Sequence, residues 1–200
     1  MTSDGFKKIF IGLIFVFLDI VIFINWLPDF IGYILMLEGC VMLSSKEKLF
    51  KNTVNPLKIL TGISIIKLLI FILTNFMMDI YVAEEMKNSI YYFCAIESFN
   101  IVSTVLWVYV VFYLLKGVYA MVAERGDNVI LRHINFTMVC YLTLFAIEHI
   151  MTPLLYNIDF AGVIRTIAIF VVGAQAVCNI LILVIINRSK KLLEDKSDLV

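Results

Sequence analysis

The chain has 200 residues, of which 62% are hydrophobic and 16% charged, and its mean hydropathy is +0.99. Soluble domains contain roughly 45–50% apolar and about 25% charged residues, so a water-soluble globule is excluded. The 16 Phe, 9 Tyr and 2 Trp exclude a disordered chain, and the net charge of +0 offers no basic stripe for nucleic acid. The composition therefore predicts an integral membrane protein whose main partner is the lipid bilayer.

Six apolar runs have about the length that crosses a hydrocarbon core, which takes about 20 helical residues. They lie near residues 7–26, 29–45, 56–77, 89–116, 134–153 and 160–187. Pro28 and Asp29 separate the first two runs, which predicts a tight helical hairpin, and Asn55 followed by Pro56 predicts the start of the third helix. Residues 1–200 are thus expected to form one all-α domain, a bundle of six transmembrane helices.

Lysine and arginine mark the side of the membrane that faces the cytoplasm. With the N-terminus inside, the inner face carries thirteen such residues and the outer loops carry only Lys87. The thirteen are Lys7, Lys8, Lys46, Lys48, Lys51, Lys58, Lys116, Arg125, Arg132, Arg188, Lys190, Lys191 and Lys196. This asymmetry predicts a multi-pass protein of the bacterial cytoplasmic (plasma) membrane with both termini in the cytoplasm.

Two helix starts share a short sequence pattern. Asp29-Phe-Ile-Gly opens the second span and Asp159-Phe-Ala-Gly opens the sixth, and each Asp is predicted to cap its helix by accepting backbone N–H groups. Either a duplicated hairpin or convergent capping explains the repeat.

Seven ionisable residues fall within the spans, where they are costly and usually face the bundle interior or a partner. The helical rise of 1.5 Å per residue gives the depth of each of them in the membrane, and the depths form two groups. One group lies below the outer surface, and the other lies near the midplane. The outer cluster is Asp19, Glu97, Glu148, His149 and Arg165, and the central pair is Glu38 and Lys67.

Helical spacing places polar residues on a restricted side of four spans. The stripes comprise Thr61, Ser64 and Lys67; Glu97, Asn100 and Thr104; Thr137, Tyr141, Glu148 and Thr152; and Arg165, Gln175 and Asn179. These faces are expected to be buried against one another.

Two interpretations of the outer cluster stay open. Three carboxylates against one arginine are suited to a binding site for a cation, a proton, or a cationic or zwitterionic solute. Alternatively, Arg165 bridges Glu97 or Glu148 and the cluster only fixes helix packing. The central Glu38–Lys67 pair likewise acts either as a structural ion pair or as a proton relay.

Signatures of enzymes are missing from the sequence. Glu148-His149 has the wrong order for H-E-x-x-H and no second histidine at helical spacing, and there is no G-x-S-x-G elbow, P-loop or dinucleotide-binding turn. The cysteines, Cys40, Cys94, Cys140 and Cys178, lack C-x-x-C spacing. We expect no catalytic residues, no cofactor and no metal site.

The turn L-P-D-F-I-G-Y at residues 27–33, with Gly12 and Asp19 before it, resembles a group of small bacterial multi-pass membrane proteins of unknown function that share this turn. The resemblance covers the first quarter of the chain and implies no activity. In size and topology the chain is also similar to the six-helix substrate-binding subunits of energy-coupling-factor vitamin importers. Their A-x-x-x-A contact motif is absent from the first span, so this likeness concerns topology alone.

The leading functional hypothesis is a small transporter or membrane solute-binding subunit that uses the outer cluster. The alternative is a non-catalytic accessory, sensor or immunity-type protein that acts through a membrane protein partner. Small residues that allow close helix contacts would serve either such a partner or internal packing. They are Gly117, Ala120, Ala123, Gly173 and Ala176.

Overall fold

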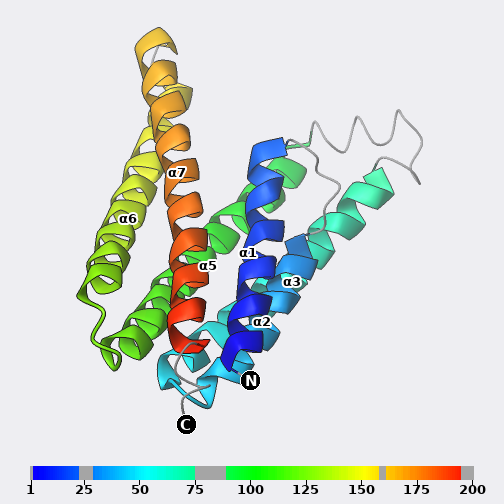
Figure 1. Ribbon diagram of the computed structural model, residues 1–200. Helices are drawn as coiled ribbons and strands as arrows, with labels where there is room; N and C mark the ends of the chain where they lie inside the picture. Colours follow the sequence, from blue (N-terminus) through cyan, green and yellow to red (C-terminus); the bar gives the residue numbers. More distant parts are fainter. Residues whose placement is uncertain (1, 23–28, 75–88, 158–160, 195–200) are drawn as a thin grey trace.

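The computed structural model describes residues 2–22, 29–74, 89–157 and 161–194, and this part of the chain is all-α (Figure 1). Its α-helices are α1 (Thr2–Ile22), α2 (Asp29–Ser44), α3 (Lys51–Ile72), α5 (Ile90–Ala123), α6 (Asn128–Asn157) and α7 (Ala161–Glu194), with a 3-10 turn, η1 (Lys48–Phe50), before α3. The all-α prediction is therefore confirmed. Each predicted span overlaps one of these helices.

Four helices in the described residues are long and apolar enough to cross a membrane. These segments are Lys48–Ile72, Ile96–Ala123, Asn128–Ile150 and Ile169–Glu194. The structure thus has the character of a multi-pass membrane protein.

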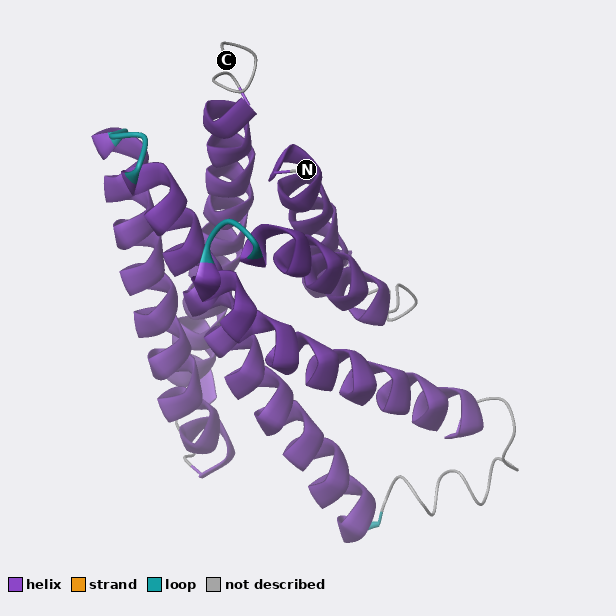
Figure 2. Cartoon of the chain, turned by 90° about the horizontal axis from the view of Figure 1, so that it is seen from below, coloured by secondary structure: helices purple, strands orange, loops and turns teal. Residues whose placement is uncertain are grey.

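The start of α1, the end of α7, the turn between α2 and α3, and the turn between α5 and α6 all lie at one end of the bundle (Figures 1 and 2). We call this the basic end, because it carries Lys46, Lys48, Lys51, Arg125, Lys190 and Lys191. Ser3 donates a hydrogen bond to Glu194 there and joins the first and last helices. At the opposite end the α6–α7 pair and the α3–α5 pair lean apart (Figure 1).

Glycines bring α1 and α2 into direct backbone contact. A Cβ atom on Gly12 would lie 2.6 Å from the Gly32 carbonyl oxygen, and a Cβ on Gly32 would lie 2.8 Å from the Gly12 oxygen. A second contact lies seven residues from the first on each helix. There a Cβ on Gly39 would lie 2.6 Å from the Gly5 oxygen. Only glycine permits this approach, which membrane helices use to gain van der Waals contact and Cα–H···O contacts.

Phe50 anchors the basic end. Its ring is fully buried, meets the Phe6 ring edge to face at 6.5 Å, and fills the space beside Gly117 on α5. Gly117 therefore serves internal packing. Because the turn is fixed by this buried ring, α3 begins at Lys51, five residues before the predicted start, and Pro56 lies inside the helix.

The turn between α5 and α6 follows from two residues. Gly126 has φ +75°, a conformation that glycine adopts without strain, and it lies just past the end of α5. The Asp127 carboxylate then accepts hydrogen bonds from the N–H groups of Val129 and Ile130, at 3.1 and 3.0 Å, and so caps α6.

We expect Gly12→Ala to destabilise the protein by about 1–3 kcal/mol, because the new methyl group forces α1 and α2 apart. The measurement is thermal unfolding in detergent. Gly62→Ala is the matched control, since a Cβ on Gly62 meets nothing within 4 Å. That variant should be as stable as the natural protein or up to about 1 kcal/mol more stable, because alanine favours helix. Equal melting temperatures for the two variants would contradict the close-contact role.

Candidate functional site

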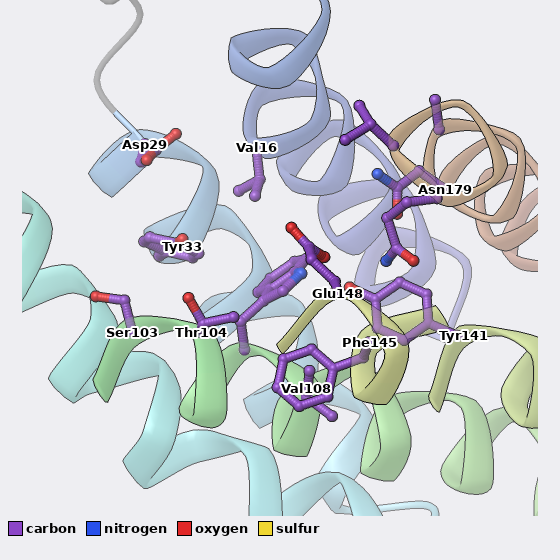
Figure 3. A pocket seen from close by; sticks show the side chains of 14 residues that line it. Val16, Asp29, Tyr33, Ser103, Thr104, Val108, Tyr141, Phe145, Glu148 and Asn179 are labelled. Atoms are coloured by element: carbon purple, nitrogen blue, oxygen red, sulfur yellow. The ribbon is translucent and has the colours of Figure 1, made fainter. Parts of the chain in front are cut away.

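A cavity of about 400 Å³ lies between five helices (Figure 3). Its walls come from α1, α2, α5, α6 and α7. The lining residues are Val16, Asp29, Tyr33, Ser103, Thr104, Trp107, Val108, Tyr141, Phe145, Glu148, Val172, Gln175, Ala176 and Asn179. The volume is within the range that small-molecule sites occupy.

The cavity lies at mid-length of the three longest helices. Trp107 is near the middle of α5 (Ile90–Ala123), Tyr141 near the middle of α6 (Asn128–Asn157) and Gln175 near the middle of α7 (Ala161–Glu194). Asp29 and Tyr33, by contrast, come from the first two turns of the shorter α2. The first turns of α2 thus lie at the level where the longer helices are half-way along their length.

Asn179 presents an unpaired polar atom at the cavity. Its side chain is only 5% exposed, and its Oδ1 atom has no hydrogen-bond partner. The Oε1 atom of Gln175, one turn away on α7, is buried without a partner as well. An unsatisfied buried acceptor costs about 1–3 kcal/mol, so both oxygens are free to accept hydrogen bonds from donors that enter the cavity.

The hydroxyl groups on α5 add further acceptors. Ser103 Oγ donates to the Phe99 carbonyl oxygen and Thr104 Oγ1 donates to the Asn100 carbonyl oxygen, both at 2.7 Å. Their protons are therefore used within the helix, while their oxygen lone pairs stay available. The two charged side chains of the described lining, Asp29 and Glu148, are both carboxylates. The formal charge of the described lining is thus negative.

Aromatic rings form the apolar part of the wall. The Trp107 ring meets the Phe17 ring at 6.0 Å, edge to face, and the Tyr33 ring at 5.8 Å, so α1, α2 and α5 together fix its orientation. Tyr141 is 3% exposed, and Trp107 and Gln175 are polar neighbours of its hydroxyl group. Aromatic faces attract cations, so these rings and the carboxylates favour the same kind of ligand.

Of the predicted outer cluster, Glu148 lines the cavity, and Figure 3 shows its carboxylate above the ring wall. Glu97 and His149 are exposed and do not line it. His149 stacks on Phe145 at 4.1 Å, and its Nδ1 atom lies 3.1 Å from the Phe145 carbonyl oxygen. The side chains of Asp19 and Arg165, and all of Asp159, lie outside the described residues.

Glu38 and Lys67 have different partners from the predicted ones. Lys8 Nζ lies 2.5 Å from Glu38 Oε2, because the antiparallel α1–α2 hairpin places these residues opposite each other. Lys67 Nζ instead donates to Asn100 Oδ1 at 2.8 Å across the α3–α5 contact. This corrects the predicted central ion pair.

The polar stripes of the sequence locate much of the cavity wall. Thr104, Tyr141, Glu148, Gln175 and Asn179 each belong to a predicted stripe, and all line this one cavity. Trp107 and Tyr33 were not predicted, because a single aromatic residue in an apolar run carries no sequence signal for a cavity. In the part of the chain that the structure describes, no group of three or more His, Cys, Asp or Glu side chains is placed to hold a metal ion.

Comparisons with known proteins give no relative: no family model, curated protein or solved structure matches the chain. The resemblance of the L-P-D-F-I-G-Y turn stays a prediction.

We expect Asn179→Leu to stabilise the ligand-free protein by about 1–2 kcal/mol, because the variant removes a buried acceptor that has no partner. Thr53→Val is the matched control. Thr53 is equally buried, but its Oγ1 donates to the Phe50 carbonyl oxygen at 2.7 Å, so its loss should cost about 1 kcal/mol. Thermal unfolding in one detergent measures both. A destabilised Asn179→Leu variant would show that the amide makes a structural contact.

Proposed function

We propose that the protein is a small transporter or membrane solute-binding subunit, and that its ligand is a small cationic or zwitterionic solute held in the five-helix cavity. The observation that carries the proposal is Asn179, whose buried Oδ1 atom has no hydrogen-bond partner at the wall of a cavity half-way along the long helices. Natural proteins seldom bury such a group unless something pairs with it.

The position of the cavity supports a transport role. Transporters bind substrates near the bilayer midplane, where either side of the membrane is equally distant. With α5, α6 and α7 across the bilayer, their middle turns lie at this depth. The site proposed here is therefore deeper than the outer-face cluster expected from the sequence, and it shares Glu148 with that cluster.

The proposed topology adds α1 and α2 to the four apolar helices as transmembrane segments. Both lie alongside the others, and the start of α1 and end of α7 share the basic end (Figure 1). Six crossings, an even number, would leave the start of α1 and the end of α7 on the same side of the membrane, as this arrangement has them. By the positive-inside rule, the basic end then faces the cytoplasm of a bacterial cell.

The chemistry of the lining favours a positive charge on the ligand. Ammonium and guanidinium groups bring N–H donors, which the Asn179 and Gln175 carbonyl oxygens lack, and a charge that Glu148 attracts. Their hydrocarbon parts would pack on Trp107 and Phe145.

We expect small organic cations to raise the melting temperature of the protein in lipid nanodiscs. The panel comprises primary amines, guanidinium compounds, quaternary ammonium compounds, amino acids, vitamins and the alkali metal ions. A ligand at a hundred times its Kd stabilises the folded state by about 2.7 kcal/mol. Glu148→Gln and Asn179→Leu should abolish the shift in melting temperature. Because Asn179→Leu is expected to stabilise the ligand-free protein, its loss of the shift would not result from unfolding. Uptake into proteoliposomes then separates transport from binding.

Glu97→Gln is the matched control, because Glu97 is an exposed carboxylate of the predicted cluster that does not line the cavity. This variant should respond to cations like the natural protein. A panel without any shift, with all variants unchanged, would contradict the solute-binding proposal. It would favour the alternative, a non-catalytic accessory, sensor or immunity-type protein, whose membrane partner should then copurify.

A further inference from the structure

A second cavity, about 240 Å³, lies on the bundle surface between α6 and α7. His133 and Arg188 line it together with apolar residues that include Phe136 and Val184. An adjoining hollow shares His133 and Phe136 and adds Arg132. We call these two hollows the α6–α7 groove. None of its residues lines the five-helix cavity.

The basic residues of the groove lie at one level. His133 is five residues after the start of α6, and Arg188 is six residues before the end of α7. At 1.5 Å per residue both are roughly 8–9 Å from the basic end. His133, Arg188 and Arg132 are exposed, whereas Asp127, the nearest acid along α6, is engaged in capping that helix. The groove therefore presents positive charge to an anion.

The rest of the groove is apolar and open. Phe136 is 61% exposed and Val184 is 41% exposed, and both lie farther from the basic end than the basic groove residues on the same helix. Both also lie within segments that are apolar enough to span a membrane, Asn128–Ile150 and Ile169–Glu194. A soluble anion would make no use of this surface, whereas an acyl chain would cover it.

We propose that the α6–α7 groove binds an acidic phospholipid of the surrounding membrane. The phosphodiester lies against Arg188, His133 and Arg132, and an acyl chain runs along Phe136 and Val184. Basic pockets between helices on the cytoplasmic side recognise such headgroups by charge, and the apolar wall fixes the lipid in place. This site is independent of the solute cavity.

The test is native mass spectrometry of the detergent-purified protein with dioleoyl phosphatidylglycerol or dioleoyl phosphatidylcholine added. The natural protein should bind the acidic lipid more tightly. Arg132→Ala with Arg188→Ala should weaken that binding roughly tenfold or more, the effect expected from two basic groups at a membrane surface. Val184→Trp keeps every charge but fills the groove, so it should weaken binding as well. All three positions are exposed, so the variants should fold.

Lys51→Ala with Lys58→Ala is the charge-matched control, since both lysines are exposed on α3 near the basic end. This variant should keep the preference for the acidic lipid. An equal loss in the control would overturn the proposal, because the charge effect would then be diffuse. Unchanged binding in Val184→Trp would also overturn it. So would displacement of the lipid by inorganic phosphate alone, because an anion site without an acyl groove would explain that result.

Discussion

The backbone contact between α1 and α2 is the constraint on which the rest of the bundle depends. Gly12 faces Gly32 and Gly39 faces Gly5 without a side chain of their own, so the two backbones come into direct contact and neighbouring side chains such as Met36 pack over the glycines. One end of the hairpin supplies Tyr33 to the cavity, and the other supplies Phe6 to the buried cluster at the basic end. Membrane helices associate through close packing of this kind, because hydrophobic burial provides little force between helices in lipid.

The two halves of the bundle differ in how tightly they are packed. The largest fully buried side chains, including Phe50, Leu57 and Leu115, gather toward the basic end, where Gly117 accommodates the Phe50 ring. Half-way along the long helices the packing gives way to a cavity with unsatisfied amides. A protein tolerates the free-energy cost of such a cavity only if other contacts fix the helices, and the buried end does this.

Sequence reasoning predicted the helices and placed five of the fourteen cavity-lining residues on polar stripes, because hydrophobic runs and polar stripes depend on helix geometry alone. Thr104, Tyr141, Glu148, Gln175 and Asn179 were identified in this way. The partner of Glu38 was not identified, because the depth of a residue along its helix does not give the direction in which its side chain points. The register of the glycine contact places Lys8 opposite Glu38. Phe50 likewise gave no signal, since its burial requires that Gly117, far along the chain, has no side chain.

The helices contact one another in the order of the chain, from α1 to α7, and α1 also contacts α7. The described helices therefore close into a ring, and the contact between the first and last of them is made without a connecting turn. On the ribosome, helices emerge in chain order, so α1 and α2 pair long before α7 is made. The Asn179 amide reaches the cavity only when α7 docks against α1, with Ser3 and Glu194 in contact at its end. The residues of α7 thus join the cavity wall after those of α1, α2, α5 and α6, and a chain that stops before α7 lacks Asn179.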